Sequence, residues 1–274
     1  MDHTILTNPT ETKLVNAVHE NLYALFRSMH ILPGSEVLES DEISYHNAFP
    51  TNPMFKGAWR TRLPVEEVEA TIDETQAWFN QRKAPSFFWW TDPLTQPADL
   101  AERLLKRGFD GNFPGEPGMV ADLFALNQNV RMPPGLTIRL VVDQKSLLDW
   151  RDVFTAAYEM PEAGGQAWYD ATLQAGLERA PWKLYVAYLV GKAVATSMLF
   201  NGAGVSGVYA VGTLPNERGK GLGAAITLKP LLDVRQQGYR FAVLFSSRKG
   251  YSVYQRLGFR EVASKIGIYF LEKD

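Results

Sequence analysis

The chain has 274 residues and a net charge of −2, with 46% hydrophobic and 21% charged residues. This is an ordinary globular composition, which leaves room for one large domain or two smaller ones. Cysteine is absent, and its absence excludes disulfides, cysteine-based zinc sites and a cysteine nucleophile that would carry an acyl group.

Charge is distributed unevenly along the chain. Up to residue 135 there are 11 Lys and Arg against 18 Asp and Glu, and beyond it 17 against 12, which gives −7 and +5. We therefore expect only the second part to meet an anionic ligand. A net charge of +5 is too small to predict a nucleic-acid partner, whereas a small phosphorylated cofactor is enough to explain it.

The sequence contains no stretch of roughly 18 uninterrupted apolar residues, as a membrane span would need. We therefore expect a cytoplasmic protein with no membrane partner. All four histidines lie in the first half, and their spacing does not resemble a metal site, so we expect no metal.

Hydrophobic periodicity predicts both helices and strands in the first half. The expected elements are a helix over 10–29, strands over 36–38 and 55–63, a helix over 65–82, a strand over 87–90, a helix over 97–107 and a strand over 119–123. The segment Met132-Pro133-Pro134-Gly135 is the best linker candidate. We therefore expect two domains, over 1–132 and 136–274.

The second half has the same mixed character. The expected elements are a strand over 136–141, helices over 144–158 and 165–179, strands over 182–189, 193–200 and 206–213, a helix over 221–237, a strand over 239–245, a helix over 249–257 and strands over 259–262 and 267–271. Turn signals between the three middle strands predict antiparallel hairpins. The pattern indicates an α/β fold of the α+β type, with a mixed, mostly antiparallel sheet flanked by helices.

A faint internal repeat connects the two halves. Arg62-Leu63-Pro64 corresponds to Thr213-Leu214-Pro215, and the helix end Leu105-Lys106-Arg107-Gly108-Phe109 corresponds to Gln255-Arg256-Leu257-Gly258-Phe259. Chance is the alternative explanation, because glycine is the usual C-cap of a helix. Five elements in one shared order favour duplication.

The strongest local signal lies in residues 211–225, where a strand, a glycine-rich turn and a helix start follow one another. Each glycine at a helix start costs roughly 0.5–1 kcal/mol relative to alanine, so three of them need a reason. The backbone amides of 219–224 can converge on a pyrophosphate at the positive end of the helix. The three glycines and the two nearby cations are Gly219, Gly221, Gly223, Arg218 and Lys220.

The spacing of this turn fits neither of two common nucleotide-binding patterns. A P-loop needs Gly-x-x-x-x-Gly-Lys-Ser/Thr, and a dinucleotide site needs Gly-x-Gly-x-x-Gly. A flexible turn before a surface helix is the other alternative to phosphate binding.

The pattern Arg218-x-x-Gly221-x-Gly223 and the helix end Tyr254-Gln255-Arg256-Leu257-Gly258-Phe259 together resemble the acetyl-CoA site of the GNAT superfamily of N-acetyltransferases. The resemblance covers residues 136–274 and implies acetyl-CoA as the acyl donor. It also implies that the strand backbone pairs with the pantetheine arm and that the turn holds the pyrophosphate. The implied cofactor-binding residues are Val211, Gly212, Thr213, Arg218, Gly219, Lys220, Gly221, Leu222, Gly223, Ala224 and Ser247, where the family often has asparagine at the last position.

Tyr254 matches the frequent general acid of this family. A phenol, with a pKa of about 10, can stabilise or protonate a departing thiolate of pKa roughly 8.5. The alternative is a packed stripe, because Tyr251, Tyr254 and Leu257 lie at helical spacing. The backbone N–H of Val211 or of its neighbour would stabilise the oxyanion.

The base that accepts the amine proton has no evident candidate on the 206–213 strand, which contains no acid. Glu159 and Glu162 follow the 144–158 helix, although both could be ordinary surface acids. We expect a small-molecule amine acceptor, and a monomer or homodimer. The residues expected at the acceptor site are Tyr158, Glu159 and Trp168, with Tyr209 as a further possibility or a core residue.

The first half resembles a degenerate GNAT copy, which makes the chain a pair of tandem GNAT-like domains. In place of the glycine turn it has three carboxylates, Glu66, Glu67 and Glu69. Acids stabilise a helix start but would repel a pyrophosphate, so we expect no cofactor in residues 1–132.

Two functions follow from the sequence. The first is direct transfer of an acetyl group from acetyl-CoA to an amine. The second is a non-catalytic acetyl-CoA or CoA-binding sensory module. The missing base favours the module, and Tyr254 counts against it.

Overall fold

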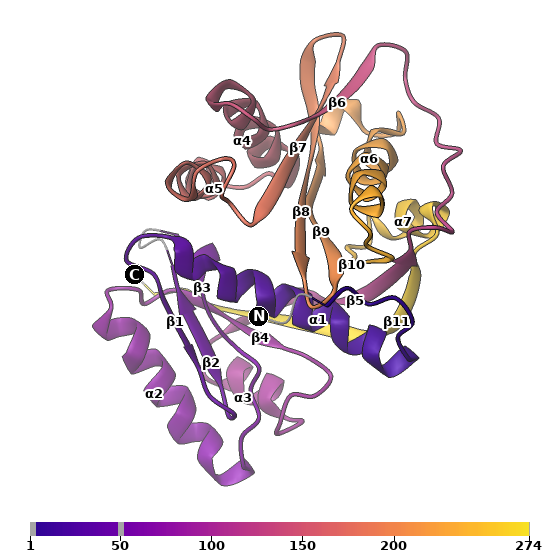
Figure 1. Cartoon of the computed structure of the whole chain (residues 1–274). Coiled ribbons are helices and arrows are strands. Elements are labelled where there is room, and N and C mark those ends of the chain that lie inside the picture. The colour runs from indigo at the N-terminus through magenta and orange to yellow at the C-terminus, as the bar shows by residue number, and fades with distance from the viewer. Residues whose placement is uncertain (1–3, 49–51, 274) are drawn as a thin grey trace. The chain divides into compact units, whose positions relative to one another are not determined.

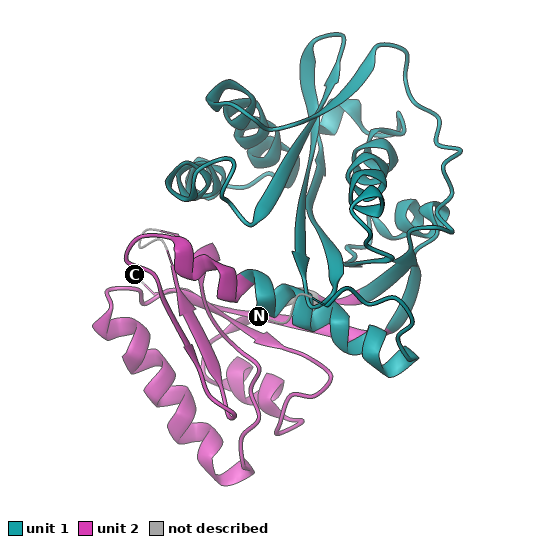
Figure 2. Cartoon of the chain, in the orientation of Figure 1, with its two compact units in different colours: residues 1–25, 118–262 teal, residues 26–117, 263–274 magenta. Residues whose placement is uncertain are grey.

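The computed structural model describes residues 4–48 and 52–273, except for the side chains of 112–114, and divides into two units. Unit 1 contains residues 1–25 and 118–262, and unit 2 contains residues 26–117 and 263–274 (Figure 2). Three elements run from one unit into the other, namely α1 (Glu11–Ser28), β5 (Asp110–Asp122) and β11 (Arg260–Leu271). The linker expected at 132–135 lies within unit 1.

Unit 1 is built on a sheet with the strand order β5-β10-β9-β8-β7-β6 (Figure 1). Neighbouring strands are antiparallel except for β9 and β10, which are parallel. The three expected hairpin strands are therefore confirmed. The strands besides β5 are β6 (Leu136–Leu140), β7 (Trp182–Leu189), β8 (Lys192–Gly202), β9 (Val205–Thr213) and β10 (Phe241–Phe245).

Helices cover both faces of the sheet in unit 1 (Figure 1). One face carries α4 (Gln144–Tyr158) and α5 (Glu162–Ala175), and the other carries α6 (Leu222–Gln236) and α7 (Tyr251–Leu257). Helix α4 packs on the sheet through buried residues such as Trp150, whose Nε1 donates to Ser197 O at 3.1 Å. The mixed, mostly antiparallel sheet flanked by helices agrees with the sequence analysis.

Unit 2 contains β1 (Glu36–Glu39), β2 (Ser44–Asn47), β3 (Lys56–Trp59), β4 (Phe87–Thr91), α2 (Val68–Gln81) and α3 (Leu100–Lys106). Its core includes Phe79 of α2, stacked on Phe87 of β4 with ring centroids 4.0 Å apart. Strand β2 was not predicted, because its four residues are mostly polar. A 3-10 turn over Val65–Glu67 leads to α2, where unit 1 has its glycine turn.

The strands β5 and β11 are longer than the sequence predicted. The two strands expected over 259–262 and 267–271 form the single strand β11, and the strand expected over 119–123 is the end of β5. Buried and exposed residues alternate in β11 through Val262, Ser264 and Ile266, so a small serine keeps the period where hydrophobicity alone shows a gap. The end of β5 pairs with β10 in unit 1, and the end of β11 pairs with β4 in unit 2.

The repeat seen in the sequence has a counterpart in the order of elements. Unit 2 contributes β3, α2, β4 and α3 before β5, and unit 1 contributes β9, α6, β10 and α7 before β11. In both series the strand before the first helix is parallel to the strand after it. The same strand-helix-strand-helix-strand order therefore occurs twice along the chain.

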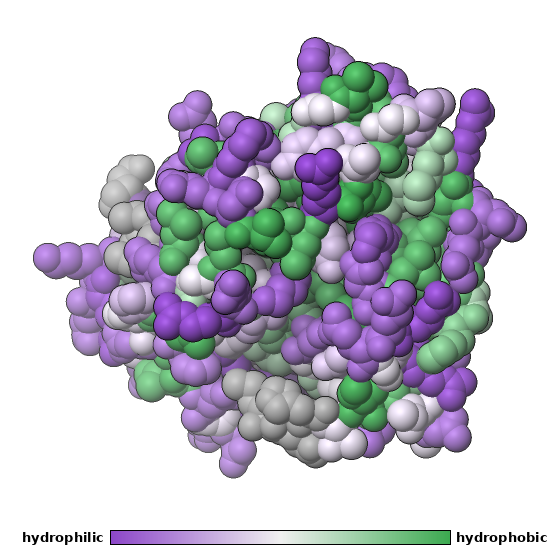
Figure 3. All heavy atoms as spheres, turned by 45° about the horizontal axis from the view of Figure 1, so that its top comes forward, coloured by the Kyte–Doolittle hydropathy of each residue, from purple (hydrophilic) through white to green (hydrophobic). Residues whose placement is uncertain are grey.

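Several large hydrophobic side chains of unit 1 are exposed, among them Phe124, Val142 and Val190. Figure 3 shows hydrophobic residues interspersed with hydrophilic ones on one face. Such exposure is common on folded proteins and does not by itself indicate a partner. None of the helices in the described part of the chain is long and apolar enough to cross a membrane.

Candidate functional site

Strand β9 has an open backbone edge near its end. Its parallel pairing with β10 reaches only as far as Gly207 among the described residues. On the other side β9 stays paired with β8, and the Leu214 N–H donates to Val194 O at 3.0 Å. The N–H and C=O groups of successive residues point to opposite sides of a strand. Because the N–H of Leu214 points toward β8, the N–H and C=O groups of Val211 and Thr213 point toward the open side.

Two side chains reach the carbonyl groups on this open edge. The Tyr158 hydroxyl donates to Val211 O at 3.3 Å, and Arg218 Nε donates to Thr213 O at 3.3 Å. Tyr158 ends α4, and Arg218 lies in the turn before α6. Both hydrogen bonds are long and exposed, so the amide groups of a ligand can replace them at little cost.

The two cations of the glycine turn are both paired. Arg218 Nη2 donates to Ala157 O at 2.9 Å and lies 3.5 Å from Glu159 Oε1, so its guanidinium joins the end of α4 to β9. A cation is favoured there because the last carbonyl groups of a helix carry partial negative charge. Lys220 Nζ lies 2.7 Å from Glu217 Oε2. The sequence analysis expected both residues to bind the cofactor. In the structure their charged groups are paired within the protein, and the contact with a phosphate stays a prediction.

The close packing of α4 against β9 explains why residue 212 is a glycine. A Cβ atom at this position would stand 2.8 Å from the Cβ of Ala157 and 3.2 Å from a ring carbon of Tyr158. Any side chain would therefore push the end of α4 away from β9. The missing Cβ lets Tyr158 approach the open edge.

The glycines of the turn differ in backbone conformation and in the space around each Cα atom. Gly219 and Gly221 have φ angles of 80° and 82°, which other residues rarely adopt. A Cβ on Gly221 would also stand 2.7 Å from Arg131 O. On Gly223 a Cβ would meet Thr213 Oγ1 at 3.9 Å, which is ordinary contact. Neither strain nor crowding explains a glycine at Gly223, and space remains over the first turn of α6.

The first turn of α6 presents backbone amides that precede its intrahelical hydrogen bonds. Ala225 N donates to Gly221 O at 3.1 Å, and the N–H groups of Leu222, Gly223 and Ala224 come before it. No side chain from the described residues caps the helix at Gly221. These amides form the positive end of the helix dipole, which is a suitable place for a phosphate.

Residues 138–262 match the family model described as the acetyltransferase (GNAT) domain. This part of the chain is a GNAT acetyltransferase domain. The mycothiol acetyltransferase of Saccharomonospora viridis is 28% identical to the chain over 151 residues, which are 50% of this chain and 49% of that protein. The match therefore spans about half the length of this curated relative.

Solved structures share the fold over nearly the whole chain. A GCN5-related N-acetyltransferase from Kribbella flavida has a TM-score of 0.72 at 18% identity, covering 95% of this chain and 96% of that one. A tandem GNAT protein from the clavulanic acid biosynthesis pathway has a TM-score of 0.60 at 12% identity, covering 97% and 96%. At such identities the likeness concerns the fold alone, and it confirms the expected tandem GNAT-like fold class.

Tyr254 belongs to the hydrophobic core of the GNAT domain. Its side chain is 8% exposed, and its ring lies edge-on to Phe259 with centroids 5.9 Å apart. The same cluster contains Leu222, and Val211 and Ala224 pack against it. The cluster therefore connects Tyr254 to both β9 and the start of α6. This position agrees with both interpretations of Tyr254, as part of a packed hydrophobic stripe and as a general acid.

Ser247 lies between β10 and α7 and holds the start of that helix. Its Oγ accepts from the Gly250 N–H at 3.3 Å, and its backbone oxygen accepts from the N–H groups of Gly250 and Tyr251, each at 3.1 Å. The contact expected between Ser247 and the cofactor stays a prediction.

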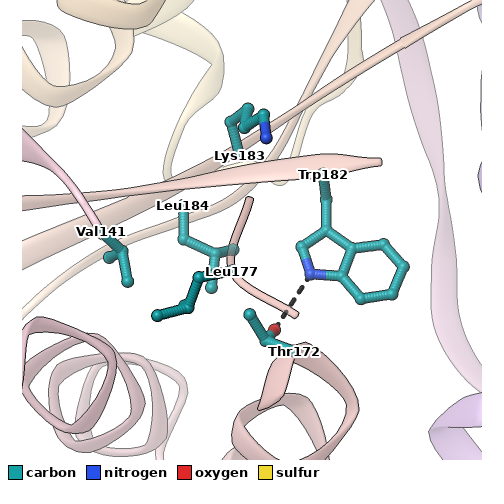
Figure 4. A pocket seen from close by; sticks show the side chains of 6 residues that line it. All are labelled: Val141, Thr172, Leu177, Trp182, Lys183 and Leu184. Carbon is teal, nitrogen blue, oxygen red and sulfur yellow. Dashed lines mark hydrogen bonds between the residues drawn. The ribbon is translucent and has the colours of Figure 1, made fainter. Parts of the chain in front are cut away.

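The residues expected at the acceptor site lie in two places. Tyr158 and Glu159 are at the end of α4 beside β9, with Glu159 exposed. Trp168 is only 7% exposed and packs at a right angle on Trp182, with centroids 5.6 Å apart. Trp182 donates to Thr172 Oγ1 at 3.0 Å beside a cavity of about 10 Å³, roughly the size of one water molecule (Figure 4). The structure thus buries Trp168 in the packing of α5 on β7, away from the surface that carries Glu159.

A groove of about 460 Å³ lies between α4 and α5. Arg151 Nη1 donates to Gln166 Oε1 at 3.0 Å, and Arg151 Nε donates to Asp152 Oδ1 at 2.8 Å, so both sides of this guanidinium have partners. The lining carries one cation, Arg151, and three carboxylates, so negative charge predominates in the groove although Glu159 is also paired with Arg218. The lining residues are Arg151, Asp152, Thr155, Ala156, Glu159, Met160, Glu162 and Gln166.

Tyr209 takes part in the packing of α1 within unit 1. Its hydroxyl donates to Asn21 Oδ1 at 2.6 Å, and burial raises the pKa of Tyr209. Asn21 Nδ2 donates in turn to Gly202 O at 2.8 Å and Val205 O at 3.2 Å. The sequence analysis did not single out Asn21, because a lone asparagine in an amphipathic helix forms no pattern.

Residues 4–48 and 52–273 contain no group of three or more His, Asp or Glu side chains placed to hold a metal ion. The side chains gathered at the open edge are a phenol, a guanidinium and a carboxylate, from Tyr158, Arg218 and Glu159. Their chemistry is that of hydrogen bonding and proton transfer.

Proposed function

We propose that the GNAT domain transfers an acetyl group from acetyl-CoA directly to an amine of a small molecule. The observation that carries the proposal is the open edge at Val211 and Thr213 beside the uncapped first turn of α6. An arm with two amide groups fits an open strand edge, and a pyrophosphate fits a helix N-terminus. The acetyl-CoA molecule contains both groups.

Binding in this proposal is an exchange of hydrogen-bond partners. The amide groups of the pantetheine arm replace the Tyr158 hydroxyl and the Arg218 Nε as donors to β9. Gly223 leaves the space for the pyrophosphate, and the backbone N–H groups of the turn donate to it. The ion pairs of Arg218 and Lys220 fix the shape of the turn.

The transfer step needs three contributions from the protein. The amine nitrogen attacks the thioester carbonyl carbon, and the N–H of Val211 donates to the oxyanion that develops. As the C–N bond forms and the C–S bond breaks, the Tyr254 hydroxyl gives its proton to the departing thiolate. Glu159 accepts the proton that the cationic amine loses before its nitrogen attacks, and the proton that leaves the nitrogen after attack restores the Tyr254 hydroxyl. No cysteine is present to carry the acetyl group, so transfer is direct.

Charge indicates the class of acceptor. An amine is cationic before it reacts, and the turn after α4 carries Glu159 and Glu162 beside the α4–α5 groove. The relative from Saccharomonospora viridis is named for mycothiol, so the acceptor of that protein belongs in the first panel of amines. Because that match spans about half of each chain, the panel also needs amino acids, polyamines and aminoglycosides.

A non-catalytic CoA sensor is the second candidate. The carboxylate of Glu159 lies 3.5 Å from the Arg218 guanidinium, which holds it away from the role of a base. In this case the cofactor contacts would remain and the chemistry would be lost.

A thiol-release assay with the full chain, acetyl-CoA and the amine panel separates these candidates. Sustained CoA release that depends on one acceptor supports the enzyme and excludes the sensor. Calorimetric binding of CoA without release for any amine would favour the sensor. Failure of acetyl-CoA and CoA to bind would contradict both candidates.

A further inference from the structure

The segment between β5 and β6 is attached to the GNAT domain at the end of α7. Asn127 N donates to Leu257 O at 3.1 Å, and Asn127 Nδ2 donates to Arg256 O at 3.0 Å. Leu126 is buried in the same hydrophobic cluster as Leu257, and Val130 packs against that cluster. This segment, of which the sequence analysis identified only residues 132–135 as a linker, therefore follows the surface of the domain.

The same segment meets the glycine turn at the start of α6. The carbonyl oxygen of Arg131 lies 2.7 Å from the place where a Cβ of Gly221 would be. The missing Cβ of Gly221 thus makes room for the backbone of Arg131 and not only for a ligand. Val130 packs against the cluster that contains Leu222, so the backbone of Arg131 is held at the start of α6.

Arg131 differs in its contacts from the two cations of the turn. Arg218 and Lys220 are paired with Glu159 and Glu217. The side chain of Arg131 is exposed, and within residues 4–48 and 52–273 its guanidinium makes no hydrogen bond or ion pair. The backbone of Arg131 lies against Gly221 at the start of α6, so its exposed side chain can extend toward a phosphate group on that turn. A guanidinium has the charge and the donor geometry to hold such a group.

We infer that Arg131 binds a phosphate group of the CoA molecule, as a residue supplied from outside the glycine turn. The inference rests on the proposed function, since it concerns the acyl donor of that site. Arg131 supplies the mobile positive charge that Arg218 and Lys220 cannot supply while they remain paired. Two phosphate positions of CoA suit it, the pyrophosphate and the ribose 3′-phosphate.

Calorimetric titration of CoA and 3′-dephospho-CoA into the wild type and Arg131→Ala tests the inference without relying on turnover. Loss of a charge-assisted contact predicts affinity for CoA weakened about tenfold. An equal loss for both ligands assigns Arg131 to the pyrophosphate, and a loss for CoA alone assigns it to the 3′-phosphate. Either result supports the inference.

Arg139→Ala is the matched control, because Arg139 is an exposed arginine on β6 whose guanidinium lies over the Tyr188 ring at 5.8 Å. It removes the same charge and should leave both affinities within about twofold of wild type. Affinities of Arg131→Ala that match this control would overturn the inference. If wild type binds neither ligand, the proposed function fails as well, so the two failures are distinguishable. Thermal unfolding of both variants checks that the fold is retained.

Discussion

Gly223 differs from the other glycines of the turn, because neither its backbone conformation nor its surroundings would exclude a side chain. The helix N-terminus also tolerates an acid, so Gly223→Glu should fold. Its carboxylate would lie where the pyrophosphate binds, and like-charge repulsion should weaken CoA binding at least tenfold by calorimetry, an effect of about 1.4 kcal/mol or more.

Gly223→Gln is the control for size, because it differs from Gly223→Glu in charge. It should bind CoA more tightly than the glutamate variant. Equal affinity of wild type and Gly223→Glu would remove the first turn of α6 as the phosphate site. Gly221 is unsuitable for this test, since a side chain there meets the Arg131 backbone and strains the turn.

Tyr254 can be tested by removing its hydroxyl and keeping its ring in the core. Tyr254→Phe should lower kcat about a hundredfold, the usual range for a general acid, with CoA affinity nearly unchanged. Tyr251→Phe is the matched control on the same helix, where the hydroxyl donates to Glu261 at 2.7 Å. An unchanged kcat in Tyr254→Phe would leave Tyr254 with its packing role alone.

The contacts of single residues in the turn were only partly predictable from the sequence. The glycine turn was recognised from spacing, but Gly212 packs against α4 and Gly221 meets Arg131. Each of these partners is distant in sequence, so no local pattern could reveal it. The pairing of Arg218 with the end of α4 was hidden for the same reason.

At the scale of elements, the end of α1 packs on β2 in unit 2 through a buried histidine. Phe26 of α1 stacks on His46 of β2 with centroids 4.4 Å apart, and neither ring nitrogen of His46 has a hydrogen-bond partner in the described part of the chain. Burial lowers the pKa of His46 to about 3. The neutral imidazole is therefore the form that this packing accepts.

This packing predicts a pH dependence of stability. The pKa of His46 is lower in the folded chain than its ordinary value of about 6.5, so below pH 6.5 the unfolded chain binds a proton that the folded chain does not. Stability should be full above pH 6.5 and fall toward pH 3, by about 1.4 kcal/mol per pH unit from this group. Urea unfolding of the wild type and His46→Leu between pH 7 and pH 4 measures the effect.

The leucine variant should lose less stability on acidification than the wild type. His30→Gln, at an exposed histidine, is the control and should keep the wild-type slope. Parallel pH profiles for wild type and His46→Leu would show that His46 does not make this contribution.

Helices were predicted more accurately than strands at this scale. The long helices α1, α4 and α6 lie within a few residues of their expected bounds. In α1 and α4 a hydrophobic period near 3.6 persists over several turns. The short polar strand β2 was missed, and β11 was divided at its polar centre. A strand of four residues gives too few positions for alternation to be recognised.

For the whole molecule, the sequence predicted the GNAT domain and the tandem fold class, because the glycine turn and the order of elements are encoded locally. The sequence did not predict that β5 and β11 each run from one unit into the other. That arrangement depends on the pairing of β5 with β10 in unit 1 and of β11 with β4 in unit 2, and the paired residues are more than a hundred positions apart in each case. Local sequence patterns do not reveal pairing between strands so far apart in the chain.

The central claim is that acetyl-CoA binds along the open edge of β9 and over the first turn of α6. A crystal structure of the chain with CoA tests it most directly. The account predicts a pantetheine arm paired with Val211 and Thr213, the Tyr158 hydroxyl displaced from Val211 O, and a pyrophosphate on the amides of 219–224. A CoA molecule bound elsewhere, with the hydrogen bond from Tyr158 to Val211 intact, would contradict it.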